Sequence, residues 1–218
     1  MEIKYLYEDV WRGISYRGKP LTYPSENAVL ENMTGELPAT AWADIEILDW
    51  LPEDDTQPVN YGFADTRFGR VLVANTRKGV CYIGLINGDD GAVLADFNKR
   101  FGHTLRTEER TDFQKQALDF LDGRRSGHIT LHLRGTSYQT GIWRRLIRIP
   151  FGKVVSYATL AGDKDHSRAA GAANGRNPVF WIVPCHRAVK SDGSFDRYFW
   201  GEDIKKRLLA WELTNCNY

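Results

Sequence analysis

The pattern of apolar and polar residues predicts strands in the middle of the chain. Between residues 59 and 86, apolar runs alternate with glycine-containing turns, which is typical of a β-meander. Apolar residues then recur at helical spacing over 92–100 and over 111–121, where Thr111 is a candidate cap. Strict alternation over 128–133 predicts one more strand.

Beyond residue 136 the apolar positions indicate a mainly helical region. They predict a helix over 137–149 and a last helix over 204–213. Between these, Ser156 is placed to cap a short helix at 157–161, and a polar turn leads to a second helix at 167–175. Two short helices joined by a tight turn predict a helix-turn-helix unit.

Residues 1–58 carry the weakest pattern. Prolines interrupt them repeatedly, so we predict only a short helix around Ser25–Met33, with Ser25 as its cap. The acidic stretch Leu51–Pro58 is predicted to be a linker. No role follows from this region.

Composition indicates a globular protein in a reducing compartment. The chain has 218 residues, enough for one large domain or two small ones. Its three cysteines are widely spaced and form no Cys-x-x-Cys pair, so we expect neither a disulfide framework nor a metal site. The first residues show no signal-peptide pattern and no long apolar stretch. We therefore expect a cytoplasmic protein without a membrane span.

Charge is distributed unevenly between the two halves of the chain. Residues 134–218 hold 14 Lys and Arg against 7 Asp and Glu, whereas residues 1–133 hold 15 against 21. A basic half beside an acidic half indicates that the C-terminal half binds nucleic acid. Chance variation between small domains is the alternative explanation.

The clearest candidate chemistry surrounds Cys185. A predicted apolar strand, Phe180–Val183, leads into the tetrapeptide Pro184-Cys185-His186-Arg187. A thiol is a nucleophile as its thiolate, and a neighbouring imidazole or cation makes that form accessible. Glu212, near the end of the last predicted helix, could complete a Cys–His–Glu relay. From these residues alone, a buried structural thiol is the simpler interpretation.

Further short motifs accompany this tetrapeptide in a fixed order along the chain. They are Gly69–Ala74, Gly79–Cys81, Arg134–Gln139, Ile142-Trp143, Ile149–Gly152, Val155–Tyr157, Leu160-Ala161, Arg168–Gly171, Asn177-Pro178, Asp192-Gly193, Tyr198, Trp200-Gly201, Lys205, Leu208-Leu209 and Glu212. Together they resemble the O6-alkylguanine-DNA alkyltransferases, also called methylated-DNA–protein-cysteine methyltransferases. The resemblance covers roughly 59–213 and is greatest to the C-terminal half of the bacterial adaptive-response protein.

The resemblance implies an α+β fold. Residues 59–133 would form a ribonuclease-H-like domain of sheet and helices. Residues 134–213 would form a helical, winged-helix-like domain that holds the active site and the helix-turn-helix. Residues 1–58 would be an N-terminal extension, and 214–218 a tail.

The resemblance also implies roles for individual residues. Cys185 would accept the alkyl group, with His186 and Glu212 generating its thiolate. Tyr157 would help to rotate the nucleotide and protonate the guanine, and Asn177 would hold the hinge before the active-site segment. The main-chain carbonyls of Cys185 and Ala188 would accept hydrogen bonds from the guanine amino group. The implied DNA-binding residues are Arg168, Tyr157, Ala169, Ala170, Gly171 and Arg176. The implied pocket residues are Pro184, Ala188, Tyr198, Phe199, Trp200 and Arg197.

The implied activity is a single-turnover transfer of a methyl group from O6-methylguanine, less readily from O4-methylthymine, to Cys185. The partner would be double-stranded DNA carrying O6-alkylguanine, bound by a monomer without any cofactor. The base must leave the stack, and Arg168 would fill the gap. Two departures from the family stand out: a shortened turn before Arg168, and Asp196-Arg197 where glycine commonly precedes Tyr198. A non-enzymatic protein that binds alkylated DNA, or a transcription factor using the helix-turn-helix alone, are the alternatives.

Overall fold

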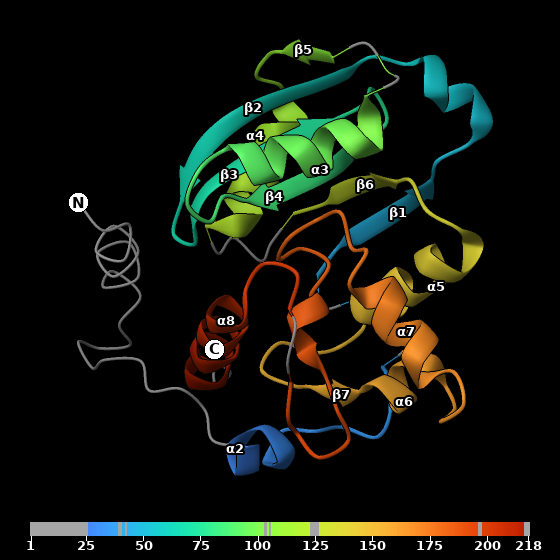
Figure 1. Cartoon of the computed structure of the whole chain (residues 1–218), viewed down its shortest axis with the longest axis vertical. Coiled ribbons are helices and arrows are strands. Elements are labelled where there is room, and N and C mark those ends of the chain that lie inside the picture. The colour runs from blue at the N-terminus through green and yellow to red at the C-terminus, as the bar shows by residue number, and fades with distance from the viewer. Residues whose placement is uncertain are drawn as a thin grey trace. The chain divides into compact units, whose positions relative to one another are not determined.

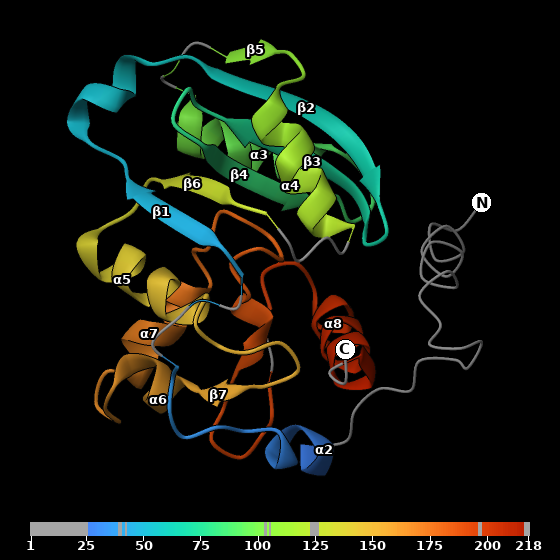
Figure 2. The ribbon, with the colours of Figure 1, turned by 180° about the vertical axis from the view of Figure 1, so that it is seen from behind.

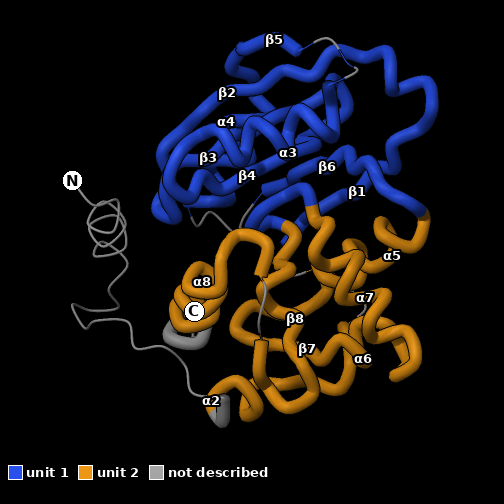
Figure 3. Tube along the Cα trace, viewed as in Figure 1, with its two compact units in different colours: residues 1–13, 43–136, 178–182 blue, residues 14–42, 137–177, 183–218 orange. Residues whose placement is uncertain are grey.

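The computed structural model describes residues 26–38, 41, 43–102, 104, 106–122, 127–195 and 198–215. The chain forms two compact units (Figure 3). Of the described residues, unit 1 takes those within 43–136 and 178–182, and unit 2 takes those within 26–41, 137–177 and 183–215. No helix among the described residues is long and apolar enough to cross a membrane.

Unit 1 is built on a six-stranded sheet with the strand order β1-β6-β4-β3-β2-β5 (Figure 1). The predicted meander is confirmed as β2 (Val59–Thr66), β3 (Gly69–Asn75) and β4 (Val80–Leu85), with each strand antiparallel to the next. The predicted strand near 128–133 is β6 (Ile129–Leu133).

Two further strands were not predicted from the sequence. β1 (Ile45–Asp49) lies parallel to β6, and β5 (Arg106–Glu108) lies parallel to β2. β5 is only three residues long, and in β1 the adjacent Ile47 and Leu48 break the alternation, so neither strand stands out in the sequence.

Two helices cover opposite faces of the sheet (Figures 1 and 2). α3 (Gly91–Phe101) packs Phe97 and Phe101 into one cluster with alternate strand residues such as Leu72. α4 (Asp112–Leu121) lies on the other face, where a Cβ at Gly62 would stand 3.1 Å from Gln114 Oε1. Both predicted helices are confirmed, and the Thr111 side chain caps α4 by accepting from the Gln114 N–H.

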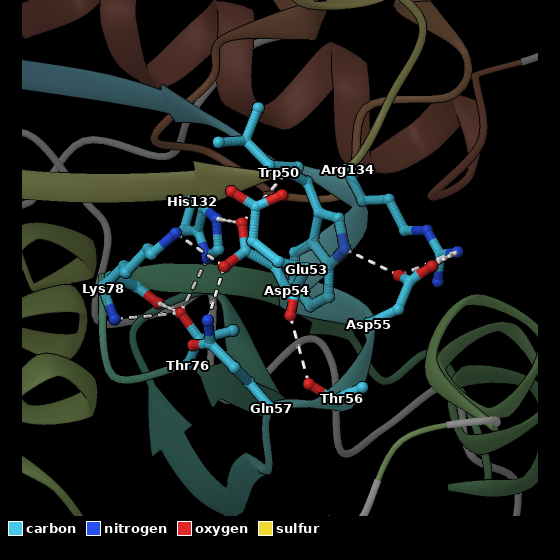
Figure 4. A network of polar contacts seen from close by, with 12 residues as sticks. Trp50, Glu53, Asp54, Asp55, Thr56, Gln57, Thr76, Lys78, His132 and Arg134 are labelled. Atoms are coloured by element: carbon cyan, nitrogen blue, oxygen red, sulfur yellow. Dashed lines mark hydrogen bonds and ion pairs between the residues drawn. The ribbon is translucent and has the colours of Figure 1, made fainter.

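The predicted acidic linker at 51–58 is wrong, because this segment anchors a buried polar network in unit 1 (Figure 4). Pro52–Thr56 form a 3-10 helix, η1, and Asp54 is completely buried. Asp54 accepts from Lys78 Nζ at 2.6 Å and contacts the His132 ring at 3.1 Å. Burial raises the pKa of Asp54, but Lys78, the Leu51 N–H and His132 together lower that pKa to about 2.

The predicted strand at 180–183 is also wrong. Val179 forms a single bridge with Ile83 of β4, and the Phe180 N–H donates to Ile83 O at 2.9 Å. Trp181 then takes a φ of 67°, which ends the extended backbone. The Trp181 ring packs on Phe68 of the same unit, with ring centroids 4.5 Å apart. The apolar run favoured a strand, but the backbone turns at Trp181 and only Val179 pairs with β4.

Unit 2 contains the predicted helix-turn-helix. Ser156 caps α6 (Tyr157–Ala161) by accepting from the Thr159 N–H at 3.0 Å, as expected. Gly162 ends this helix at a φ of 96°, a left-handed conformation that favours glycine. The second helix, α7 (Ser167–Asn174), is held to the helix α5 (Ser137–Leu146) by a hydrogen bond from Trp143 Nε1 to Ala173 O at 3.0 Å.

The remaining elements of unit 2 frame these two helices. They are α2 (Glu26–Glu31), α5 (Ser137–Leu146), the strands β7 (Val155–Ser156) and β8 (Ala188–Val189), the 3-10 helix η2 (Cys185–Arg187) and α8 (Glu202–Asn215). β7 and β8 pair in parallel. α5 ends three residues before its predicted end, and α8 extends beyond both ends of its prediction. The predicted cap of α2, Ser25, lies outside the described residues.

The helix α2 and the residues that follow it are part of the core of unit 2. Val29 is fully buried in a cluster with Val154, Val189 and Leu209, and Met33 and Phe195 pack against that cluster. The backbone joins as well, since the Val154 N–H donates to Asn32 O at 3.1 Å and Val154 O accepts from the Thr34 N–H at 2.9 Å. Residues outside the family resemblance therefore support the domain that carries Cys185.

Candidate active site

Cys185 opens the 3-10 helix η2, with its side chain only 2% exposed. Its Sγ lies 3.2 Å from Tyr198 Oη, and Asn177 also hydrogen-bonds to the thiol. Burial raises the pKa of this thiol, while Tyr198, Asn177 and the charge of Lys205 act in the opposite direction. The resting sulfur is therefore a thiol, with groups beside it that favour its ionised form.

Glu212, the predicted acid, lies at the centre of a buried cluster of charges. His186 Nε2 is 2.8 Å from Glu212 Oε1, and Arg187 Nη2 donates to the same oxygen at 2.9 Å. Arg187 Nε reaches Oε2, also at 2.9 Å, and the Gly152 N–H donates to Oε2 at 3.2 Å. The structure therefore places Glu212 in hydrogen-bonding contact with His186, as the sequence predicted.

The charge states within this cluster follow from burial and pairing. Burial alone raises the pKa of Glu212, but Arg187 and His186 outweigh it and lower that pKa to about 2. Burial lowers the pKa of His186, against the opposing influence of Glu212. At neutral pH a neutral imidazole therefore faces an ionised carboxylate. The described partners of the Cys185 sulfur are Tyr198 and Asn177, so the link from the sulfur to His186 stays a prediction.

Two residues that belong to the quoted motifs, Arg187 and Lys205, contact the site although no role in it was predicted for them. Arg187 binds Glu212 in a fork and donates from Nη1 to Ile149 O at 2.6 Å. Lys205, almost fully buried, donates to Ala188 O at 2.5 Å and lies 5.6 Å from the centre of the Tyr198 ring. The sequence held a signal for Lys205, because Lys205 and Glu212 stand seven residues apart on one helix, on the same face as the buried Leu208.

A small cavity borders the sulfur. Its volume is about 40 Å³, room for a few water molecules and too little for a nucleobase. Its lining residues are Tyr157, Gly171, Asn174, Gly175, Asn177, Cys185, Tyr198, Phe199, Trp200 and Lys205. Seven of these belong to the predicted site.

Other predicted pocket residues lie elsewhere. Pro184 and Ala188 are buried and do not line this cavity, although the carbonyl of Ala188 contacts Lys205. Arg197 lies outside the described residues. Phe199 is 50% exposed, so it forms the outer edge of the cavity.

The predicted DNA-binding residues of α7 lie partly on its exposed side and partly on its buried side. Arg168 and Ala169 are exposed, as is Arg176 just beyond the helix, whereas Ala170 is fully buried and packs its methyl group into the interior. Gly171 lies at the Tyr157 ring, since a Cβ there would be 3.9 Å from two ring carbons.

The same region matches a known protein family. Residues 137–214 match the profile described as 6-O-methylguanine DNA methyltransferase, DNA binding domain. The inducible methylated-DNA–protein-cysteine methyltransferase of Bacillus subtilis strain 168 is 33% identical over 157 residues, covering 69% of this chain and 86% of that protein. The chain belongs to the methylated-DNA–protein-cysteine methyltransferase family. The resemblance predicted from its motifs is confirmed.

Two further matches extend the comparison. The bifunctional transcriptional activator/DNA repair enzyme Ada of Escherichia coli K12 is 35% identical over 164 residues, covering 72% of this chain and 46% of Ada. The chain therefore spans about half the length of that relative. Mycobacterium tuberculosis OGT, solved in complex with DNA, matches with a TM-score of 0.57 and 26% identity over 71% of this chain and 93% of that one. The predicted α+β fold is confirmed by this match.

Proposed function

We propose that the chain transfers the methyl group of O6-methylguanine in double-stranded DNA to Sγ of Cys185, once per molecule. The observation that carries this proposal is a thiol at a cavity, hydrogen-bonded by Tyr198 and Asn177 and followed at once by the buried His186–Glu212 pair. Membership in a family named for this reaction supports it.

The reaction balances with the thiol and the base alone. The sulfur forms a bond to the methyl carbon while the bond from that carbon to O6 breaks. The thiol proton leaves through His186, whose imidazole is oriented by Glu212. The departing guanine regains one proton, supplied by the hydroxyl of Tyr157 at the cavity. The product is a thioether, which is stable, so each molecule reacts once.

Access to the sulfur requires movement. Because the cavity holds only about 40 Å³, the segment from Tyr198 to Trp200 must move aside before an extruded base can enter. Arg168 is exposed on α7 and is proposed to fill the gap that the base leaves in the duplex. O4-methylthymine is proposed as a poorer substrate.

We further infer a ribonuclease-H-like character for unit 1 and a winged-helix-like character for unit 2. The run β4-β3-β2-β5, with β5 parallel to β2, supports the first inference. The pair α6 and α7 beside the β7–β8 ribbon supports the second. The functional division at 59–133 and 134–213, the monomeric state, the cytoplasmic location and the preference for alkylated DNA stay predictions.

Mass spectrometry tests the proposed function directly. After incubation with excess duplex containing O6-methylguanine, the peptide that holds Cys185 should gain one methyl group and the duplex should lose it. Cys81→Ala should react like the unsubstituted chain, whereas Cys185→Ala should bind the lesion without removing it. An unmodified Cys185 peptide would refute the transfer. Lesion binding without transfer would instead favour the non-enzymatic alternative.

A further inference from the structure

Asn174 contributes an unusual polar group to the cavity. It is the last residue of α7, it is 5% exposed, and it lines the cavity together with Cys185. Its Nδ2 donates to the carbonyl oxygen of Cys185 at 3.2 Å. This bond fixes the orientation of the amide, since the flipped amide would place two oxygen atoms together. The other end of the amide, Oδ1, is buried and has no hydrogen-bond partner among the described residues.

The carbonyl of Cys185 is already fully used. It accepts from Asn174 Nδ2 and also from the main-chain N–H of Ala188. A carbonyl oxygen has two lone pairs, so both are occupied. The family resemblance assigned this carbonyl to the amino group of guanine. In this chain, the open acceptor beside it is Asn174 Oδ1.

The chemistry of the lesion identifies the donor that fits this acceptor. Alkylation at O6 removes the N1 hydrogen of guanine, so the 2-amino group is the donor left on its pairing edge. Alkylation at O4 of thymine removes the N3 hydrogen and leaves no donor there. A buried acceptor gains a partner from the first base and stays unpaired beside the second, which disfavours the second.

We propose that Asn174 is a specificity-determining residue, whose Oδ1 accepts a hydrogen bond from the 2-amino group of the flipped O6-alkylguanine. This inference rests on the proposed function and adds the group by which the pocket recognises its base. It also assigns Asn174 a second task, because the same amide occupies the Cys185 carbonyl that would otherwise receive the amino group.

Two duplexes that differ by one amino group test the inference. Single-turnover transfer to Cys185 is measured with O6-methylguanine and with O6-methylhypoxanthine, which lacks the 2-amino group. The unsubstituted chain should react faster with the guanine lesion by about tenfold or more. Asn174→Leu keeps the size of the side chain but removes the acceptor. It should slow transfer from the guanine lesion and lower the ratio of the two rates, and the Cys185 carbonyl that it frees should recover only part of the preference.

The hypoxanthine duplex is the internal control, because its rate should be similar in the unsubstituted chain and in Asn174→Leu. Asn174→Ala repeats the test with a smaller side chain. Phe199→Ala, at the exposed edge of the cavity, should change both rates by the same factor. Equal rates for the two lesions in the unsubstituted chain, or an unchanged ratio in both Asn174 variants, would overturn the inference. Transfer from neither lesion to the unsubstituted chain would overturn the proposed function, and this inference with it.

Discussion

Arg187 is the residue on which the charge state of Glu212 depends most. Its guanidinium binds both carboxylate oxygens, and its charge is the largest influence that opposes burial in setting the pKa of Glu212. Without Arg187, Glu212 would be a buried carboxylate with a neutral imidazole as its main side-chain partner. The ionised state of Glu212 therefore depends on the last residue of the Pro184–Arg187 tetrapeptide, for which the sequence predicted no separate role.

Replacing Arg187 by Met should lower the free energy of unfolding by about 3–5 kcal/mol at pH 7, because an uncompensated buried charge remains. The folded-state pKa of Glu212 is lowered to about 2, so its stabilising contribution is complete above its unfolded pKa and is lost as pH falls toward 2. The difference between variant and parent should therefore shrink between pH 6 and pH 3.

Urea unfolding across this pH range measures the effect. Arg168→Met removes an exposed arginine and should change the free energy of unfolding by less than about 0.5 kcal/mol. A loss for Arg187→Met as small as that of Arg168→Met, or one that does not vary with pH, would contradict this account of Glu212.

At the residue scale, the nucleophile and its chemical partners could be predicted from the sequence, but their exact contacts could not. Cys185, His186 and Glu212 could be predicted because their order along the chain resembles a known family. The Tyr198–Cys185 bond and the open oxygen of Asn174 could not be predicted. Both depend on how side chains from separate segments meet, and spacing along one segment does not contain that information.

At the scale of elements, strands and helices with a regular apolar spacing could be predicted, whereas short elements and those of mixed composition could not. The meander and the helices α3, α4, α6 and α7 carry regular spacing and were predicted within a few residues. The acidic segment at η1 was wrongly predicted to be a linker, because composition does not reveal that Asp54 is buried and hydrogen-bonded within unit 1. The apolar run at 180–183 was misread because four apolar residues fit a strand or a packed turn equally well.

The N-terminal segment makes a testable contribution to unit 2. Val29→Ala should lower the free energy of unfolding by about 2 kcal/mol, because it leaves a cavity beneath Val154, Val189 and Leu209. It should also slow methyl transfer, since Phe195, which precedes Tyr198, packs against the same cluster. Denaturant unfolding and the single-turnover rate measure the two effects.

The adjacent residue gives a matched control. Leu30 is 39% exposed on the same helix, so Leu30→Ala should change the free energy of unfolding by less than about 0.5 kcal/mol. If both substitutions destabilise the chain equally, or neither does, the segment is not part of the core of unit 2 in solution.

At the scale of the whole molecule, the sequence indicated two parts of different character, and their charges differ as well. Residues 134–218 have a net charge of +7 and residues 1–133 a net charge of −6. The structure adds that the two units are not simple halves, since residues 178–182 belong to unit 1 although the residues on either side belong to unit 2. The assignment of residues 178–182 to unit 1 depends on contacts between residues that are distant in sequence, so no local sequence pattern predicts it.

This charge distribution predicts how DNA binding depends on salt. Duplex affinity should fall as salt rises, because lysines and arginines of unit 2 displace counterions from phosphates. Arg168→Ala should weaken binding and reduce the slope of log affinity against log salt by about one phosphate contact. Arg110→Ala removes an exposed arginine from unit 1 and should leave both affinity and slope unchanged. Equal effects of the two substitutions, measured by fluorescence anisotropy over a salt series, would show that the basic character of unit 2 does not direct binding.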